Sequence, residues 1–176
     1  MKKNLILHIG SPKTGTSSLQ VFFNRNRNLL RTYFDLSFPA TGQGGAYSSL
    51  PLSHHLFAWS LTEYPSYACD AIVDSSVYLE QLLSEINTSP FSTFIISSEA
   101  LFSTLFSSSD LQFLSKNFNV KIICYLRPPD QFIEANFGTN IQMFVNSPNN
   151  IFDFIASSKA ILDYSNVLSQ FIKIFG

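Results

Sequence analysis

The sequence predicts an α/β fold with three layers, in which helices flank a mainly parallel central sheet. Two observations carry this prediction. Short, continuously apolar segments alternate along the chain with longer segments in which apolar residues return every three or four positions. The first pattern is typical of strands buried on both faces of a parallel sheet, and the second is typical of amphipathic helices. Strands that alternate with helices form βαβ units, which build such a sheet.

The elements of the first third follow these patterns in order. Residues 4–9 are mostly apolar and predict a buried strand. Residues 16–31 predict a helix, on one face of which lie Leu19, Phe22, Phe23, Leu29 and Leu30. Weak alternation predicts a second strand at 33–38. The glycine-rich segment 39–53 predicts a loop.

The middle of the chain continues the alternation. Helical spacing predicts helices at 54–63 and 75–87, with a buried strand at 91–97. A helix at 108–116 and a strand at 120–126 follow. After the Pro-Pro pair that ends this last strand, helices are expected to the end of the chain, because a proline pair stops a strand and starts a helix well.

Composition limits the class of protein. The chain has 176 residues, 45% of them apolar, which suits one globular domain with a substantial core. Eleven basic residues stand against twelve acidic ones, which argues against nucleic acid as the main partner. No apolar run approaches a membrane span, and the apolar start breaks too early for a signal peptide. With only Cys69 and Cys124, two reduced thiols are expected, and the interpretation is a cytoplasmic protein.

The loop between the first strand and the first helix is the most informative segment. It reads Gly-Ser-Pro-Lys-Thr-Gly-Thr-Ser-Ser over residues 10–18. A strand that turns directly into a helix points free backbone N–H groups and the positive end of the helix dipole at one spot, which predicts a phosphate-type anion site. Gly10 and Gly15 have P-loop spacing, but Thr16 stands where the P-loop lysine belongs. This departure argues against a Mg-dependent nucleoside triphosphatase.

The string from Pro12 to Leu19 resembles the 5′-phosphosulfate loop of the sulfotransferases that use 3′-phosphoadenosine 5′-phosphosulfate (PAPS). A second resemblance lies at residues 121–130, where a strand ends in Arg127, as in the family strand whose arginine binds the nucleotide 3′-phosphate. The family also uses a serine about two helical turns later. Here Ala135 stands at that place, and its neighbour Asn136 is the only candidate to substitute for the serine.

The resemblance implies a P-loop-like fold and a single sulfotransferase-like domain over residues 1–176. It also implies that C-terminal elements of the family fold are absent, because the last helix of this chain normally leads into a further strand and a nucleotide-binding loop. Either the protein is naturally short or it is a fragment.

The resemblance further implies a set of site residues. PAPS would be the donor, with no metal. The nucleotide and its phosphosulfate would contact Pro12, Lys13, Thr14, Gly15, Thr16, Ser17, Ser18, Arg127 and Asn136. Lys13 would neutralise charge on the leaving group. The proton of the acceptor hydroxyl needs a base, for which Glu99, His54 and His55 are equal candidates; the alternative is that these three residues only cap or pack helices.

Three functions remain open on the sequence. The leading hypothesis is a sulfotransferase that moves a sulfuryl group from PAPS to a hydroxyl of a carbohydrate or another small molecule. Ala135 and the early end of the chain suggest instead a degenerate relative that binds a nucleotide or a partner without catalysis. A P-loop kinase or nucleoside triphosphatase is the third, and Thr16 opposes it. The acceptor and the oligomeric state are not encoded in any pattern that we can interpret.

Overall fold

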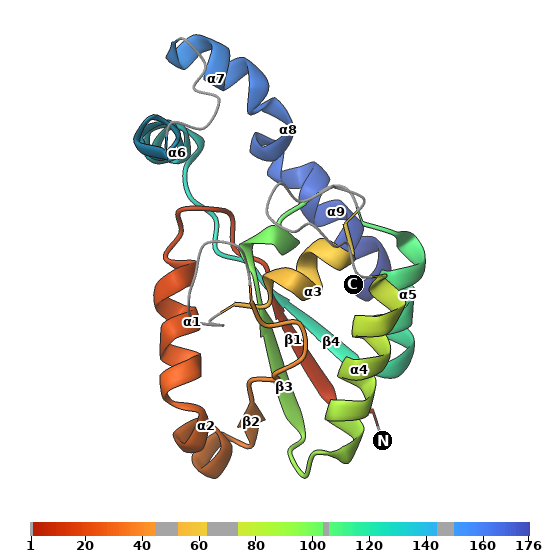
Figure 1. Ribbon diagram of the computed structural model, residues 1–176. Helices are drawn as coiled ribbons and strands as arrows, with labels where there is room; N and C mark the ends of the chain where they lie inside the picture. Colours follow the sequence, from red (N-terminus) through yellow and green to blue (C-terminus); the bar gives the residue numbers. More distant parts are fainter. Residues whose placement is uncertain (1, 45–52, 63–73, 104–105, 144–149) are drawn as a thin grey trace.

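The computed structural model describes residues 2–44, 53–62, 74–103, 106–143 and 150–176 (Figure 1). Within these ranges strands and helices alternate as the sequence predicts. In chain order, the elements are β1 (Asn4–His8), α1 (Thr16–Arg25), α2 (Arg27–Phe34), β2 (Leu36–Ser37), α3 (His55–Ser60), α4 (Ser75–Thr88), β3 (Thr93–Ser97), the short 3-10 helix η1 (Glu99–Leu101), α5 (Ser108–Asn117), β4 (Asn119–Ile123), α6 (Pro129–Met143), α7 (Ile151–Ser157), α8 (Lys159–Leu162) and α9 (Tyr164–Phe175).

The four strands form one parallel sheet in the order β2-β3-β1-β4. β1 lies inside the sheet, and its Ile6 pairs with Ile95 of β3 on one side and with Lys121 of β4 on the other. The α/β class and the parallel sheet flanked by helices are therefore confirmed. All carboxyl ends of the strands lie at one edge of this sheet, where ligands bind in open α/β folds.

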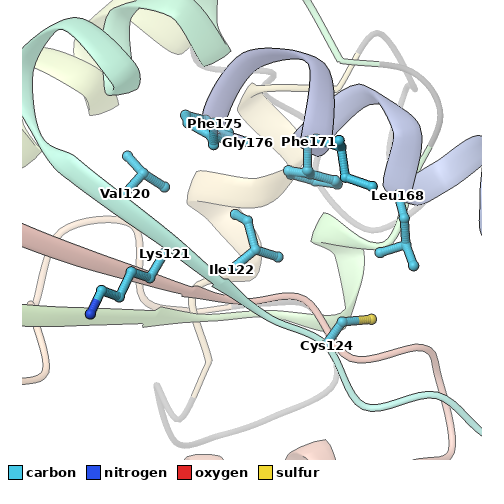
Figure 2. A pocket seen from close by; sticks show the side chains of 9 residues that line it. Val120, Lys121, Ile122, Cys124, Leu168, Phe171, Phe175 and Gly176 are labelled. Carbon is cyan, nitrogen blue, oxygen red and sulfur yellow. The ribbon is translucent and has the colours of Figure 1, made fainter.

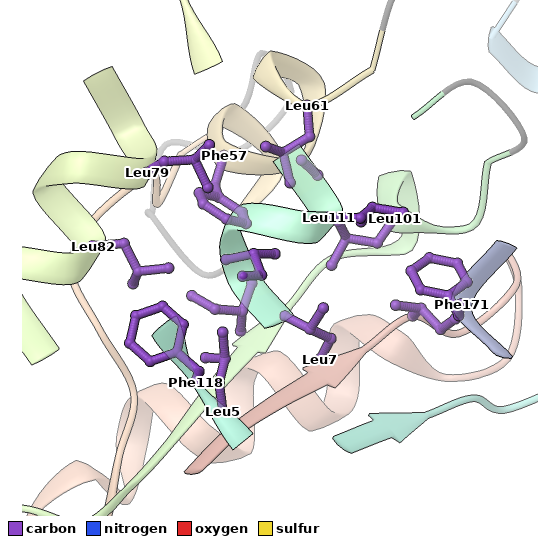
Figure 3. Close-up of a cluster of buried hydrophobic side chains, with 14 of the residues drawn as sticks. Leu5, Leu7, Phe57, Leu61, Leu79, Leu82, Leu101, Leu111, Phe118 and Phe171 are labelled. Atoms are coloured by element: carbon purple, nitrogen blue, oxygen red, sulfur yellow. The ribbon is translucent and has the colours of Figure 1, made fainter. Parts of the chain in front are cut away.

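The main core lies on one face of the sheet. Figure 1 shows α1 and α2 on one side of the strands and α3, α4 and α5 on the other. Leu5 and Leu7 of β1 point into the second side, where they meet Phe57 of α3, Leu82 of α4 and Phe171 of α9, all fully or nearly fully buried (Figure 3). Burial of each such side chain contributes about 1.5–3 kcal/mol, so these helices are held firmly against the strands.

The single helix expected at 16–31 is wrong in one respect, because the chain forms two helices. Asn26 ends α1 and precedes α2, and both its backbone N–H and its side-chain Nδ2 donate to the carbonyl of Phe22, at 3.0 and 2.8 Å. An asparagine side chain that bonds to the nearby backbone competes with helix continuation. The break leaves Phe22 and Leu29, which were expected on the apolar face, 49% and 44% exposed.

Two strands also differ in extent from the prediction. The strand expected at 33–38 shrinks to Leu36–Ser37, because Tyr33 and Phe34 belong to the end of α2. β4 ends at Ile123, although the chain beyond it still runs beside β1, since the N–H of Ser11 donates to the carbonyl of Tyr125 at 3.0 Å. The strand at 91–97 and the helices at 75–87 and 108–116 agree with the structure to within two residues.

A polar network fastens the segment after β2 to the body of the protein. Glu85 of α4 accepts hydrogen bonds from the backbone N–H of Ala40 (2.8 Å) and from the N–H and hydroxyl of Thr41 (2.9 and 2.7 Å). Arg27 donates to the carbonyl of Phe38 and to the side chain of Gln43, both at 2.8 Å. These bonds hold residues 38–43 beside the sheet, next to the start of α3.

The C-terminal helices form a second, smaller cluster. Phe132 and Ile133 of α6 pack against Phe154 of α7, separately from the main core. Figure 1 shows α6, α7 and α8 beyond the carboxyl edge of the sheet, and α9 returning to its side. Helices from residue 129 onward are confirmed. In the described part of the chain, no helix combines the length and apolar character that crossing a bilayer requires.

Candidate functional site

Along the loop between β1 and α1, the backbone angle φ alternates in sign. Lys13 has φ of 66° and Gly15 has φ of 85°, whereas Thr14 between them and Thr16 after them have ordinary negative values. Successive residues of opposite hand point their N–H groups toward one concave spot, a geometry that binds anions in other proteins. Gly15 suits its position, because no side chain adopts this φ easily.

Every second carbonyl of this loop is already bonded within the protein. The carbonyl of Ser11 accepts from the Thr14 hydroxyl (2.6 Å), that of Lys13 accepts from Arg127 Nη1 (2.8 Å), and that of Gly15 accepts from the N–H groups of Ser18 and Leu19. In the part of the chain that the structure describes, the N–H groups of residues 13–17 have no acceptor. The loop therefore has five free N–H donors, while three of its carbonyls are already bonded.

Gly10 lets the loop fold back on itself. A Cβ at this position would lie 2.9 Å from Cγ2 of Thr16, 3.0 Å from Oγ1 of Thr14 and 3.5 Å from Nε2 of His8. The first two distances are too short for a normal contact, so any side chain at Gly10 would push the loop apart. His8 lies beneath, 1% exposed, with Nδ1 bonded to the Ser97 hydroxyl at 2.8 Å, as expected for a packed core histidine.

The electrostatic setting favours an anion. Gly15 caps α1 without a side-chain hydrogen bond, and the first turn of α1 contains no acidic residue, so nothing on the helix itself offsets its positive end. Lys13 is exposed, and its ammonium group has no partner among the described residues. An ammonium group, free N–H groups and a helix N-terminus thus meet at one loop.

Arg127 is brought to this loop as the sequence predicts. Its side chain donates to the Lys13 carbonyl, and its own carbonyl accepts from the hydroxyl of Tyr164 at 2.8 Å. The first residue of α9 thus anchors the segment that follows β4, whose Arg127 reaches the loop after β1. One guanidinium nitrogen is used in the loop contact, and the remaining N–H groups of the fork are available to a ligand.

The Thr16 hydroxyl does not face a ligand as a donor, which corrects one prediction. It donates to Oε2 of Glu99 at 2.7 Å, and the Thr14 hydroxyl donates to the loop carbonyl of Ser11. Of the four hydroxyls expected to hold the anion, only those of Ser17 and Ser18 are exposed without a partner in the described chain. Thr14 and Thr16 therefore offer a ligand their backbone N–H groups only.

His54 is a structural residue, and its candidacy as a base is wrong. Its ring is fully buried, Nδ1 accepts from the N–H of Ser97 (3.1 Å), and Nε2 donates to the carbonyl of Pro39 (3.1 Å). Burial lowers the pKa of His54 to about 4. Both nitrogens are thus committed to the backbone, and neither is free to accept the proton of an acceptor hydroxyl.

His55 has a different setting. Its Nδ1 lies 2.7 Å from the hydroxyl of Ser98, and its ring stacks on Trp59 with the centroids 5.3 Å apart. Burial lowers the pKa of His55, and the Glu99 carboxylate raises it by a smaller amount. Because Glu99 also accepts from Thr16, His55 and Glu99 lie beside the start of α1. Nε2 of His55 remains without a partner among the described residues.

Asn136 lies in the middle of α6 and is half-buried, and its side chain makes no hydrogen bond to the loop or to any other part of the described chain; the same helix carries Ala135. The residues that α6 buries pack against α7. Pro12 is half-buried in the loop and, lacking an N–H, contributes shape only.

Two residues that sequence reasoning missed shape this site. Ser98 orients His55, and Tyr164 anchors Arg127. Ser98 stands in the Ser-Ser-Glu string after β3, a signal that we used only for Glu99. Tyr164 gave no signal, because its apolar ring fits helical spacing and its hydroxyl partner is 37 residues away.

Comparisons with known proteins add no relative: no family model, no curated protein and no solved structure matches this chain. Within the described residues, no three His, Cys, Asp or Glu side chains gather as a metal site would require. The site therefore rests on its own geometry, in which the tips of β1, β3 and β4 touch through Glu99–Thr16 and Arg127–Lys13 contacts.

Proposed function

We propose that this protein is a sulfotransferase that moves a sulfuryl group from PAPS to a hydroxyl of a carbohydrate or another small molecule, on a P-loop-like fold. One observation carries the proposal: the carbonyls of Ser11, Lys13 and Gly15 are bonded within the protein, that of Lys13 to Arg127, while the N–H groups of residues 13–17 have no acceptor in the described chain. A nucleotide with phosphate groups at both the 5′ and the 3′ positions needs two separate cationic sites. The loop with Lys13 supplies one of them and the guanidinium of Arg127 supplies the other, and a hydrogen bond joins Arg127 to the loop.

The residues present fit the donor in most respects. The N–H groups of residues 13–17 and the exposed hydroxyls of Ser17 and Ser18 suit the oxygens of a phosphosulfate. The guanidinium of Arg127 suits a phosphate, which it binds through parallel hydrogen bonds. When bound, the donor supplies an activated sulfuryl group. Lys13 then lies where negative charge on the leaving phosphate is neutralised.

We assign the base to His55. If its Nδ1–H donates to Ser98, its Nε2 is unprotonated and would accept the proton of an acceptor hydroxyl. Burial supports this role, because a lowered pKa keeps the ring neutral at pH 7. Glu99 holds Thr16 and places a negative charge near the ring, which stabilises the imidazolium after it takes the proton.

Calorimetric titration with adenosine 3′,5′-bisphosphate, the product nucleotide, tests the proposal. The wild-type protein is expected to bind it. Lys13→Ala and Arg127→Ala are each expected to weaken binding about ten-fold or more, since a hydrogen bond to a charged group contributes ~1.5–3 kcal/mol. Lys159→Ala is the matched control, because Lys159 is exposed on α8 and its loss leaves the loop unchanged.

Two results would contradict the proposal. The wild-type protein could fail to bind the nucleotide while a circular dichroism spectrum shows it folded. Alternatively, Lys13→Ala and Arg127→Ala could bind as well as Lys159→Ala, which would place the nucleotide elsewhere.

Ala135 favours a second candidate, a relative that binds the nucleotide without transferring sulfate. The side chain of alanine cannot donate to a 3′-phosphate, and the side chain of its neighbour Asn136 makes no hydrogen bond within the described chain. Assays with radiolabelled PAPS and a panel of hydroxyl acceptors separate the two functions. Transfer that is lost in His55→Asn supports catalysis, and binding without any transfer supports the second candidate.

A further inference from the structure

His8 is bonded at one ring nitrogen and unpaired at the other. Its side chain is 1% exposed, and Nδ1 lies 2.8 Å from the hydroxyl of Ser97. Nε2 is fully enclosed and has no hydrogen-bond partner among the described residues. Buried nitrogens are almost always bonded in folded proteins, so this exception calls for a physical reason.

Nε2 of His8 points at the inner side of the anion loop. A Cβ built on Gly10 would lie 3.5 Å from this nitrogen, 3.0 Å from the hydroxyl oxygen of Thr14 and 2.9 Å from Cγ2 of Thr16. Both threonines belong to the segment 13–17, whose N–H groups have no acceptor in the described chain. The ring of His8 therefore lies beneath the donors that would hold an anion.

His8 lies on the α1 side of the sheet. Side chains alternate along a strand, and Leu5 and Leu7 of β1 turn to the other side, into the main core. Figure 2 shows the same division at β4, where Ile122 turns toward α9 and Lys121 turns away from it. His8 is therefore enclosed between the sheet and α1, the helix that begins at the loop (Figure 1).

The surroundings of His8 on this side are polar. The residues that α1 buries are Thr16 and Gln20, and Nε2 of Gln20 also lacks a partner in the described chain. Ser97 borders the His8 ring through its hydroxyl, and Tyr125 borders it edge-on, with the ring centroids 5.5 Å apart. Charges interact more strongly in such a buried setting than in water, so a charge at the loop would act strongly on this ring.

Three charged side chains lie at the loop above His8. The ammonium of Lys13 and the guanidinium of Arg127 disfavour a proton on His8, whereas the carboxylate of Glu99 favours one. The ring of Tyr125, on the side of β4, is uncharged. Burial lowers the pKa of His8, so the ring is neutral at pH 7 while the loop holds no anion.

We propose that His8 is the ionisable partner of the anion loop: when a phosphate-type dianion binds at residues 13–17, His8 takes up one proton from solvent, and the imidazolium stabilises the anion from beneath. Both ring nitrogens are then donors, Nδ1–H to the Ser97 hydroxyl and Nε2–H toward the loop. The inference rests on the anion loop of the proposed function, but not on the transfer of sulfate. It makes the loop a binding site that holds its anion more tightly in acid.

Linkage fixes the direction of this pH effect. A dianion close to a buried imidazole favours the charged form of the ring, so the protein with the anion bound keeps the proton up to a higher pH. By the same thermodynamic cycle, protonated His8 binds the anion more tightly than neutral His8 does. The affinity rises about ten-fold for each pH unit by which the anion raises the midpoint of the His8 titration.

Proton NMR of the histidine rings tests the proposal on the unsubstituted protein. The chain has three histidines, and their signals are followed from about pH 8 to about pH 5. Inorganic sulfate is the probe, because it remains a dianion throughout this range, and chloride at equal ionic strength is the reference. Sulfate is expected to raise the midpoint of His8. His54 is the internal control, because its pKa of about 4 keeps its ring neutral over most of this range.

Two variants assign the signals and isolate the effect. His8→Asn places an amide where Nδ1 lies and so keeps a group that can bond to Ser97. The sulfate affinity of this variant, measured from the amide signals of residues 13–17, is expected not to rise in acid. His55→Asn is the comparison, since His55 is the other ring beside the start of α1, and it should keep most of the wild-type rise.

The outcomes separate this inference from the proposed function. A His8 midpoint that sulfate leaves unchanged while the loop amide signals shift overturns the inference alone, as does an acid-dependent rise that persists in His8→Asn and disappears in His55→Asn. If sulfate raises the midpoint but adenosine 3′,5′-bisphosphate does not bind, the proton linkage holds and the proposed function fails. A protein that binds neither anion overturns both. Because the titration uses the unsubstituted chain, poor folding of a variant does not affect it.

Discussion

At the scale of single residues, His54 and His55 are neighbours in the chain but have opposite surroundings. His54 is enclosed, with both nitrogens bonded to backbone groups, whereas His55 bonds to Ser98 through one nitrogen and keeps the other free. The sequence could place the pair at the start of a helix but could not say which ring turns inward. That choice depends on Pro39 and Ser97, which are distant in sequence and come close only in the fold.

Substitutions of the two histidines are expected to have different effects: His54 governs stability toward acid, and His55 governs sulfuryl transfer. The folded pKa of His54 is about 4 against 6.5 in the unfolded chain. Because the unfolded state binds the proton more tightly, this residue contributes stability that is complete above pH 6.5 and is lost as the pH falls toward 4. The loss amounts to about 3 kcal/mol, at 1.36 kcal/mol per pKa unit.

Urea unfolding at a series of pH values measures this effect. The stability of His54→Gln should change less between pH 6.5 and 4 than that of the wild type, although it starts lower. His55→Asn keeps a group that can bond to Ser98, so it should abolish transfer while it retains the part of this pH dependence that comes from His54. Equal acid sensitivity in the wild type and His54→Gln would contradict the assignment of His54.

The sequence predicted which residues of the loop belong to the site, but it did not predict all the contacts that they make. Lys13 and Arg127 do lie together, because two strand ends with such residues meet at one sheet edge. The contact of Thr16 with Glu99 was not foreseen, since a buried hydroxyl takes whichever acceptor the next strand end supplies.

At the scale of elements, α4 not only packs on the sheet but also fixes the segment that follows β2. Its carboxylate at Glu85 receives three hydrogen bonds from residues 40 and 41. Burial acts to raise the pKa of Glu85, but these hydrogen bonds outweigh it and lower the pKa below its ordinary value. The group therefore remains ionised and fixes the segment that leads toward α3.

Removing this carboxylate should loosen that segment. Glu85→Ala is expected to cost roughly 1.5–3 kcal/mol of the free energy of unfolding, because an exposed and a half-buried N–H group lose a charged acceptor. Glu80→Ala is the matched control, since Glu80 is exposed on the same helix. Chemical denaturation of both variants measures the difference, and equal stabilities would show that the network contributes nothing.

Element boundaries were harder to predict than element types. Helical spacing continues across residue 26, so the sequence indicated one helix where α1 and α2 are two. The end of α1 depends on a side chain that bonds to its own preceding turn, which hydrophobic periodicity does not record. Strongly patterned elements such as α4 and α5 were predicted closely, because burial of one face decides them.

At the scale of the whole molecule, apolar side chains gather in two clusters of different size. The large one surrounds β1 and β3, and the small one joins α6 to α7 through Phe132 and Phe154. The parallel sheet and its helical layers were predictable, because they follow from the order of apolar segments. The separate position of α6–α8 was not, since their apolar faces resemble those of helices that join the main core.

The two clusters should open independently. Fewer buried contacts mean a lower free energy of local unfolding, so amide hydrogens of α6 and α7 should exchange faster than those of β1 and β3. Hydrogen exchange followed by mass spectrometry on peptides measures this. Equal protection of both regions would show that the molecule unfolds as one unit.

Because φ of Lys13 is positive, stability of the fold and positive charge favour different residues at this position. A left-handed conformation costs an ordinary residue about 1–2 kcal/mol that glycine does not lose. Glycine there would make a sturdier protein, yet it would strip residues 10–18 of their sole cationic side chain. A protein that keeps a lysine at this turn is less stable than its glycine variant, but it holds a positive charge on a rigid backbone.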